Sequence, residues 1–114
     1  MKYMLLINLG EKARDYPNMS PEEQKEIAAA WQALNETPGL TPGNGLEPPD
    51  TATTVRVEDG KTLTTDGPFV EMKEALDGYC VVEADDLDAA IDVASRVPAV
   101  STGGAVEIRP IKEW

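Results

Sequence analysis

The chain has 114 residues, enough for one domain with a single modest core, so we expect one domain over residues 1–114. Its net charge of −11, from 21 acidic and 10 basic residues, repels phosphate backbones and anionic lipids and so argues against nucleic-acid and membrane binding. The chain contains no histidine, which excludes Ser-His-Asp and Cys-His catalysis and the usual zinc ligand sets.

The first part of the chain predicts a strand and a helix. Residues 2–9 are mostly apolar, too few to cross a bilayer and not followed by a cleavage site, so they predict a buried strand in a cytoplasmic protein. Residues 19–36 predict a helix in which Ser20 and Glu23 form a capping box and Pro21 takes the first position. Four residues recur at helical spacing and are expected to face the core: Ile27, Ala30, Trp31 and Leu34.

The middle of the chain predicts a loop and then a β-hairpin. In the Pro- and Gly-rich loop after the helix we expect at most a short strand, around residues 44–47. The Asp59-Gly60 pair lies between two runs of alternating residues and is typical of a type I′ turn, in which both central residues have positive φ. Val55 and Val57 in the first run point to the same side of the hairpin.

The last part of the chain predicts a strand, a helix and a strand. Residues 78–84 are apolar enough for a central strand, and we interpret Cys80 within it as a buried, unreactive thiol. A second helix is expected after Asp85, which can cap it, and this helix should end at Pro98. Residues 105–111 predict the last strand. The apolar stripe of the second helix is expected to be Leu87, Ala90, Ile91 and Ala94.

These elements place a strand, a helix and a strand in each half of the chain. Because two helices can cover only one face of a four-stranded sheet, the order predicts an α+β, ferredoxin-like βαββαβ sandwich with the hairpin as an extra element. The sheet face away from the helices, called the open face below, must be solvated, paired with a partner or used to enclose a ligand. A second copy of the chain is the commonest partner, so we expect a homodimer.

The open face is expected to carry several charged and aromatic side chains. The set is Arg56, Tyr79, Glu83, Glu107 and Arg109. Arg56 belongs to this set only if Val55 and Val57 pack against the helices. The set is either a solvated face with ion pairs at a dimer interface, or a pocket whose arginines hold an anionic small molecule through its carboxylate or phosphate. No carboxylate spacing resembles a calcium loop, and we expect neither a metal nor a cofactor.

The stretch TTDGPFVEMK contains a second candidate site. Pro68 has no N–H to donate to the Asp66 carboxylate, so we expect a stiff corner with a partly free carboxylate. In one interpretation the corner is structural, and Phe69 fills a core or a subunit contact. In the other, Asp66 is an acid/base or ligand-orienting group and Lys73 is its countercharge.

Segments throughout the chain resemble the DGPF branch of the YCII-related protein family: MKYMLLI, SPEEQ, GLEPPDTATTVR, TDGPF, KEALDGY, EADDLDAA and VEIRPI. The resemblance implies a dimeric α/β barrel in which two open faces meet, and a site near the aspartate of the motif, here Asp66. Relatives of this branch are often encoded beside sigma factors, which implies a regulatory role and a protein partner in a sigma-factor system. The family was proposed to be enzymatic partly for a histidine, and this chain has none.

Two functions are compatible with these observations, and the sequence leaves open whether the chain is an enzyme. The first is a small-molecule-binding or regulatory homodimer linked to a sigma-factor system. The second is a small enzyme acting on an anionic organic compound, with Asp66 as its acid/base. The candidate ligand-binding residues are Arg56, Phe69, Lys73, Tyr79, Glu107 and Arg109.

Overall fold

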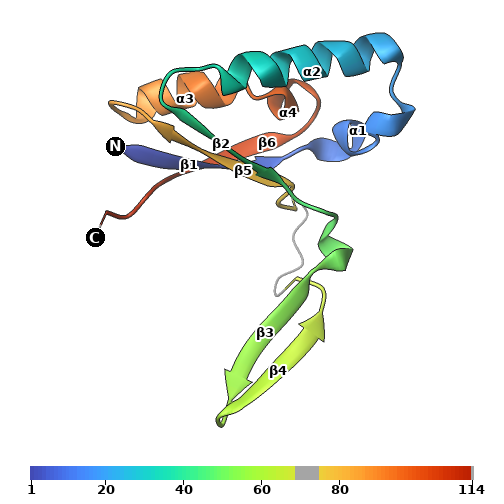
Figure 1. The fold of residues 1–114 in the computed structure, drawn as a ribbon, viewed down its shortest axis with the longest axis vertical. Helices are drawn as coiled ribbons and strands as arrows, with labels where there is room; N and C mark the ends of the chain where they lie inside the picture. The colour runs from blue at the N-terminus through green and yellow to red at the C-terminus, as the bar shows by residue number, and fades with distance from the viewer. Residues whose placement is uncertain (69–74, 114) are drawn as a thin grey trace.

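The computed structural model in Figure 1 describes residues 1–68 and 75–113. An antiparallel sheet has the strand order β2-β5-β1-β6, with β1 (Lys2–Asn8), β2 (Leu40–Gly45), β5 (Gly78–Glu83) and β6 (Ala105–Pro110). The helices α2 (Pro21–Asn35), α3 (Leu87–Ser95) and α4 (Pro98–Ser101) lie on one side of this sheet (Figure 1). The other helices of the described residues are α1 (Gly10–Arg14), η1 (Tyr16–Asn18) and η2 (Pro49–Thr51). This arrangement is consistent with the predicted ferredoxin-like fold.

The core lies between the sheet and the helices, and strand alternation decides which side chains enter it. On the central strand β1, Tyr3, Leu5 and Ile7 are buried, and on β5 Cys80 and Val82 are buried opposite them. The helical layer closes this core with Leu34, Ala90, Val93, Ala94, Val97 and Ala99. Among the helices of the described residues, none has both the length and the apolar character that crossing a bilayer requires.

The first long helix begins and ends as predicted, because its signals are local. The Ser20 hydroxyl accepts a hydrogen bond from the Glu23 backbone N–H at 3.2 Å, and Pro21 is the first helical residue. Of the predicted core residues of α2, Leu34 is buried, and Ile27, Ala30 and Trp31 are half-buried. Burial of these residues is incomplete because α2 lies beside β2, at the edge of the sheet (Figure 1).

Two predictions for the second helix are wrong in detail. Its cap is Asp86, whose carboxylate accepts from the Ala89 N–H at 2.9 Å, and not Asp85. Leu87 and Ile91 are about half exposed, because the helix instead turns its smaller residues and Val93 toward the sheet. The helix does end before Pro98, at Ser95, and Pro98 is in addition the first residue of α4, where a missing N–H costs nothing.

The strand after α2 is longer and begins earlier than the predicted residues 44–47. β2 starts at Leu40, opposite Val82 of β5, and its register shifts between Thr41 and Asn44. Pro42 lies inside this irregular part, which an edge strand tolerates because its outer N–H groups need no partner.

The predicted hairpin forms, but it stands apart from the sheet. β3 (Thr53–Glu58) and β4 (Lys61–Asp66) make a two-stranded sheet that extends away from the helical side (Figure 1). Its turn has φ of 49° at Asp59 and 74° at Gly60, which confirms the predicted turn chemistry. The condition that Val55 and Val57 pack like core residues is not met, because their side chains are 60% and 68% exposed.

Candidate functional site

The open face carries the predicted residues of β5 and β6. Leu6 of β1 lies between Tyr79 on one side and Glu107 on the other, so all three point to the same face. Arg109 lies two residues after Glu107 on β6, opposite Met4, and therefore points to the same face. Tyr79 and Glu107 are therefore separated by one strand, a spacing of about 10 Å.

The charges of the open face are paired with one another. Arg109 Nε lies 2.9 Å from Glu107 Oε2, and both side chains are mostly exposed. Glu83 lies 3.5 Å from the N-terminal amine, and the Tyr79 hydroxyl accepts a hydrogen bond from Asn44 Nδ2 at 3.0 Å. Exposed pairs of this kind contribute little to stability and leave Arg109 already engaged. The geometry therefore fits the solvated-face interpretation better than an anion pocket.

The hairpin holds two other candidate residues away from that face. Arg56 is exposed on β3, in a different sheet from Arg109, so the two arginines are not brought together. Asp66 is exposed at the last position of β4. Phe69 and Lys73 lie outside the described residues, so their proposed roles stay predictions.

The corner after Asp66 is held by one backbone hydrogen bond and one from a side-chain hydroxyl. The N–H of Gly67 donates to the Ala52 carbonyl at 2.7 Å, and the Thr54 hydroxyl donates to the Gly67 carbonyl at 2.7 Å. Gly67 has a φ of 94°, a conformation that favours glycine over other residues. These contacts support the predicted stiff corner, but they do not engage the Asp66 carboxylate.

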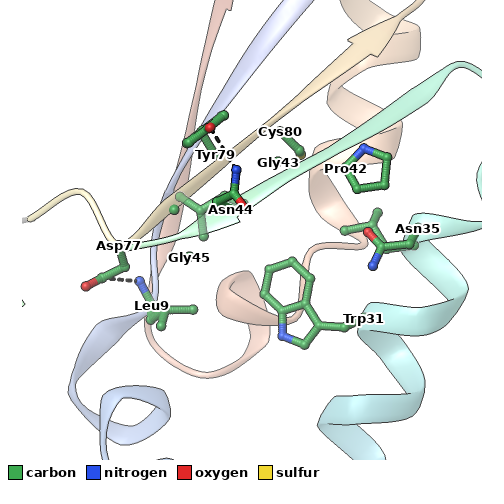
Figure 2. Close-up of a pocket in the computed structure, with 13 residues that line it drawn as sticks. Leu9, Trp31, Asn35, Pro42, Gly43, Asn44, Gly45, Asp77, Tyr79 and Cys80 are labelled. Carbon is green, nitrogen blue, oxygen red and sulfur yellow. Dashed lines mark hydrogen bonds between the residues drawn. The ribbon is translucent and has the colours of Figure 1, made fainter. Parts of the chain in front are cut away.

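A cavity of about 320 Å³ lies elsewhere, between α2 and the end of the sheet where β2 pairs with β5. Figure 2 shows Trp31 projecting from α2 into the space below β2, with Pro42 and Gly43 on the opposite wall. The lining residues are Ile7, Leu9, Trp31, Leu34, Asn35, Pro42, Gly43, Asn44, Gly45, Asp77, Gly78, Tyr79 and Cys80. Tyr79 is among the predicted ligand-binding residues, but no pattern in the sequence indicates this cavity.

Close approach of two backbones shapes the outer wall of the cavity. Gly43 lies so near β5 that a Cβ atom at this position would collide with the Tyr79 carbonyl oxygen. The register shift between Thr41 and Asn44 falls at the same place. The Pro- and Gly-rich composition of the loop, which weakens a strand prediction, is thus what allows β2 to form this wall.

Asp77 closes one end of the cavity and is buried, with 6% of its surface exposed. Its carboxylate accepts from the Leu9 N–H at 2.8 Å and from Nη2 and Nε of Arg14 at 2.9 and 3.1 Å. Its backbone N–H donates to the Ile7 carbonyl, and its carbonyl accepts from the Leu46 N–H. One residue therefore joins β1, the start of α1 and the end of β2.

The salt bridge between Asp77 and Arg14 also determines the charge at this end of the cavity. The side-chain hydrogen bond with Asp77 raises the pKa of the Arg14 guanidinium above its ordinary value, so Arg14 stays charged in this salt bridge. Sequence reasoning missed this pair, because 63 positions separate the two residues and neither lies in a recognisable motif.

Cys80 lines the same cavity, and its thiol is expected to be unreactive. Burial raises the pKa of its thiol, so the neutral form dominates at pH 7. We expect iodoacetamide at pH 7 to alkylate Cys80 at least about tenfold more slowly in the folded protein than in urea, since reaction requires opening of the core. The mass gain over time measures this ratio. Equal rates in the two conditions would contradict a buried thiol.

Two comparisons identify relatives of the chain. The profile of the YCII-related domain family matches residues 1–114. An uncharacterized protein of Rhizobium meliloti (strain 1021) is 34% identical over 88 residues, which cover 76% of this chain and 71% of that protein. Neither comparison tests the narrower DGPF branch, which stays a prediction. Because the match extends over the whole chain, this protein belongs to the YCII-related domain family.

Proposed function

We propose that this YCII-related protein binds a small, uncharged organic molecule in the cavity between α2, β2 and β5. The observation that carries this proposal is the cavity itself, whose volume of about 320 Å³ is within the range of small-molecule pockets. Trp31 offers an aromatic surface on the helical side, and Leu9 and Leu34 extend the apolar lining. Such a pocket selects ligands by apolar contact, and a few polar groups fix the orientation of the bound ligand.

The charges around the cavity favour a neutral ligand. Among the described residues that line it, Asp77 is the one with a carboxylate, and that carboxylate forms a salt bridge with Arg14. Of the two asparagines that line the cavity, Asn35 is exposed, and Asn44 Nδ2 already donates to the Tyr79 hydroxyl. These groups suit an aromatic or alicyclic alcohol, ketone or amide better than an organic anion.

The geometry favours binding over catalysis. Asp66, the candidate acid/base, is exposed on the hairpin and does not line the cavity. Arg56 and Arg109, expected to orient an anionic substrate, lie on two different sheets. A binding role, with or without a regulatory partner, therefore has the better structural support, and an enzymatic role of Asp66 is the alternative hypothesis.

The test compares benzyl alcohol with benzoate, which have similar ring size and differ in charge. In a Trp114→Phe variant Trp31 is the single tryptophan, so its fluorescence reports on the cavity. We expect benzyl alcohol to change this fluorescence and benzoate to have a weaker effect. At ten times its dissociation constant a ligand adds about 1.4 kcal/mol of stability, which raises Tm by about 5 °C for a chain of this size.

Two variants distinguish binding in the cavity from binding at the hairpin corner after Asp66. Trp31→Leu is expected to reduce the benzyl alcohol shift in Tm, because it removes aromatic surface from the wall, whereas Asp66→Asn is expected to leave that shift unchanged. The opposite pattern, with the shift lost in Asp66→Asn and kept in Trp31→Leu, would refute the proposal and favour the site at the corner. A stronger shift with benzoate that depends on Arg109 would place an anion site on the open face.

A further inference from the structure

Asn44 and Gly45 lie next to each other at the end of β2, where the first residue can react with the second. The side-chain amide of an asparagine can be attacked by the backbone nitrogen of the following residue, and glycine hinders this attack least because it has no side chain. Both residues are exposed on an edge strand. Figure 2 shows the Asn44 amide directed at the Tyr79 hydroxyl, with Gly45 following it along β2. Water, which the reaction consumes, therefore has access to the pair.

The register of β2 leaves the Gly45 N–H outside the hydrogen-bonded ladder. The Leu46 N–H donates to the Asp77 carbonyl at 2.7 Å. One position earlier, Gly45 lies opposite Gly78. Because hydrogen-bonded positions alternate along an antiparallel ladder, the Gly45 N–H points away from β5. Among the described residues β2 is the outermost strand on this side, so the attacking nitrogen is not held by another strand.

The three other asparagines of the chain, Asn8, Asn18 and Asn35, are placed differently. Each is followed by a residue with a side chain, and the backbone N–H of that residue donates to a defined acceptor. The bonds run from Leu9 to the Asp77 carboxylate at 2.8 Å, from Met19 to the Tyr16 carbonyl at 3.0 Å and from Glu36 to the Gln32 carbonyl at 3.2 Å. Asn44 is therefore the asparagine at which the attacking nitrogen is both uncrowded and not engaged in such a bond.

We propose that Asn44 is a site of spontaneous covalent modification, at which the Gly45 nitrogen attacks Asn44 Cγ. The new bond joins Gly45 N to Asn44 Cγ, and the proton of the Gly45 nitrogen passes to solvent. The bond from Cγ to Nδ2 breaks, and Nδ2 leaves as ammonia with a proton from water. A second water molecule then opens the resulting succinimide ring. Opening at Cγ gives aspartate, and opening at the main-chain carbonyl gives isoaspartate. One water is consumed in total and one ammonia is released, without oxidation or reduction.

The isoaspartate product alters β2 more than the aspartate product does. Its main chain runs through the former side chain and so contains one additional methylene group. Because the pairing of two strands depends on a regular spacing of residues, this insertion disturbs the pairing of β2 with β5. β2 is also the outer wall of the cavity, so ligand binding there should be lost, a consequence that rests on the proposed function.

Peptide mass spectrometry of the folded protein, stored in warm, mildly alkaline buffer, tests the site. We expect the mass change from amide to acid to appear at least about tenfold faster at Asn44 than at Asn18, which is also exposed but precedes Met19. Gly45→Ala should slow the change at Asn44 at least about tenfold, because the added methyl group crowds the attacking nitrogen. Asn44 reacting as slowly as Asn18, or equally fast in Gly45→Ala, would overturn the proposal.

Unfolding the protein in guanidinium chloride tests the contribution of the fold. Because the Gly45 N–H lies outside the ladder at the end of an edge strand, the reaction at Asn44 requires only local opening. We therefore expect the folded rate to be within about tenfold of the unfolded rate. A folded rate more than about a hundredfold below the unfolded rate would show that β2 protects the pair, and it would refute a modification site in the native protein.

The benzyl alcohol shift in Tm tests the consequence for the cavity. The isoaspartate form, separated by chromatography, is expected to lose this shift. Asn44→Asp is the matched control, because it has the new charge without the additional backbone atom, and it should keep the shift. An isoaspartate form with the full shift would overturn the effect on the cavity. A freshly purified wild type without any shift would instead refute the proposed function, whereas the mass change at Asn44 would still support the modification site.

Discussion

Replacement of Asp77 by alanine is expected to lower the free energy of unfolding by about 3 kcal/mol, the lower end of the range for breaking a buried ion pair. The lower end applies because the Arg14 side chain is 36% exposed and water can solvate it after the change. The Leu9 N–H loses its acceptor as well, and an unsatisfied buried donor adds its own cost. Urea unfolding followed by circular dichroism measures the difference.

Two further variants divide this loss into its parts. Asp77→Asn keeps a side-chain oxygen for the Leu9 N–H and removes the charge, so it should cost less than the alanine change. Asp92→Ala removes a carboxylate that is largely exposed and should change the unfolding free energy by less than about 0.5 kcal/mol. An Asp77→Ala variant as stable as Asp92→Ala would show that the Asp77 contacts do not hold β1, α1 and β2 together.

Features with local causes could be predicted from the sequence. The Ser20 cap needs only a hydroxyl and a backbone N–H three residues later. The Asp59-Gly60 turn likewise depends on two residues that tolerate positive φ. The alternation of β5 and β6, which points Tyr79 and Glu107 to the open face, follows from the strand period once burial is assigned.

Features with distant causes could not be predicted in the same way. Val93 is buried and Ile91 is not, because α3 turns a different side to the sheet from the one that the apolar spacing indicates. The alternating valines of β3 resemble those of a core strand, although the strand pairs only with β4. Hydrophobic alternation indicates which side of a strand is apolar, but it does not say what covers that side.

The candidate site was missed for a related reason. Its walls come from α2, β2 and β5, and β2 was the strand that the sequence indicated least clearly. Proline and glycine weaken the local signal for a strand, whereas here Gly43 is required by the approach of the Tyr79 carbonyl. A Gly within an edge strand is therefore evidence of close backbone contact, and in this chain it marks the wall of the cavity.

Gly43→Ala is the second change with a large expected effect. Because its Cβ would collide with the Tyr79 carbonyl oxygen, β2 has to move away from β5, and we expect a loss of about 3 kcal/mol in unfolding free energy. The displaced strand is also the outer wall of the cavity. The benzyl alcohol shift in Tm should therefore fall together with the stability.

Gly45→Ala provides the matched control, because it makes the same substitution two positions further along β2. At Gly45 the nearest atom to an added Cβ is the Asp77 carbonyl oxygen at 4.0 Å, an ordinary contact. This variant should therefore lose less than about 1 kcal/mol in unfolding free energy. Equal losses in the two variants would mean that glycine is needed along this strand for backbone freedom in general. If only Gly43→Ala loses stability, the cause is the close approach of β5 at this position. The shape of the cavity then depends on the contact between the Gly43 backbone and the Tyr79 carbonyl oxygen.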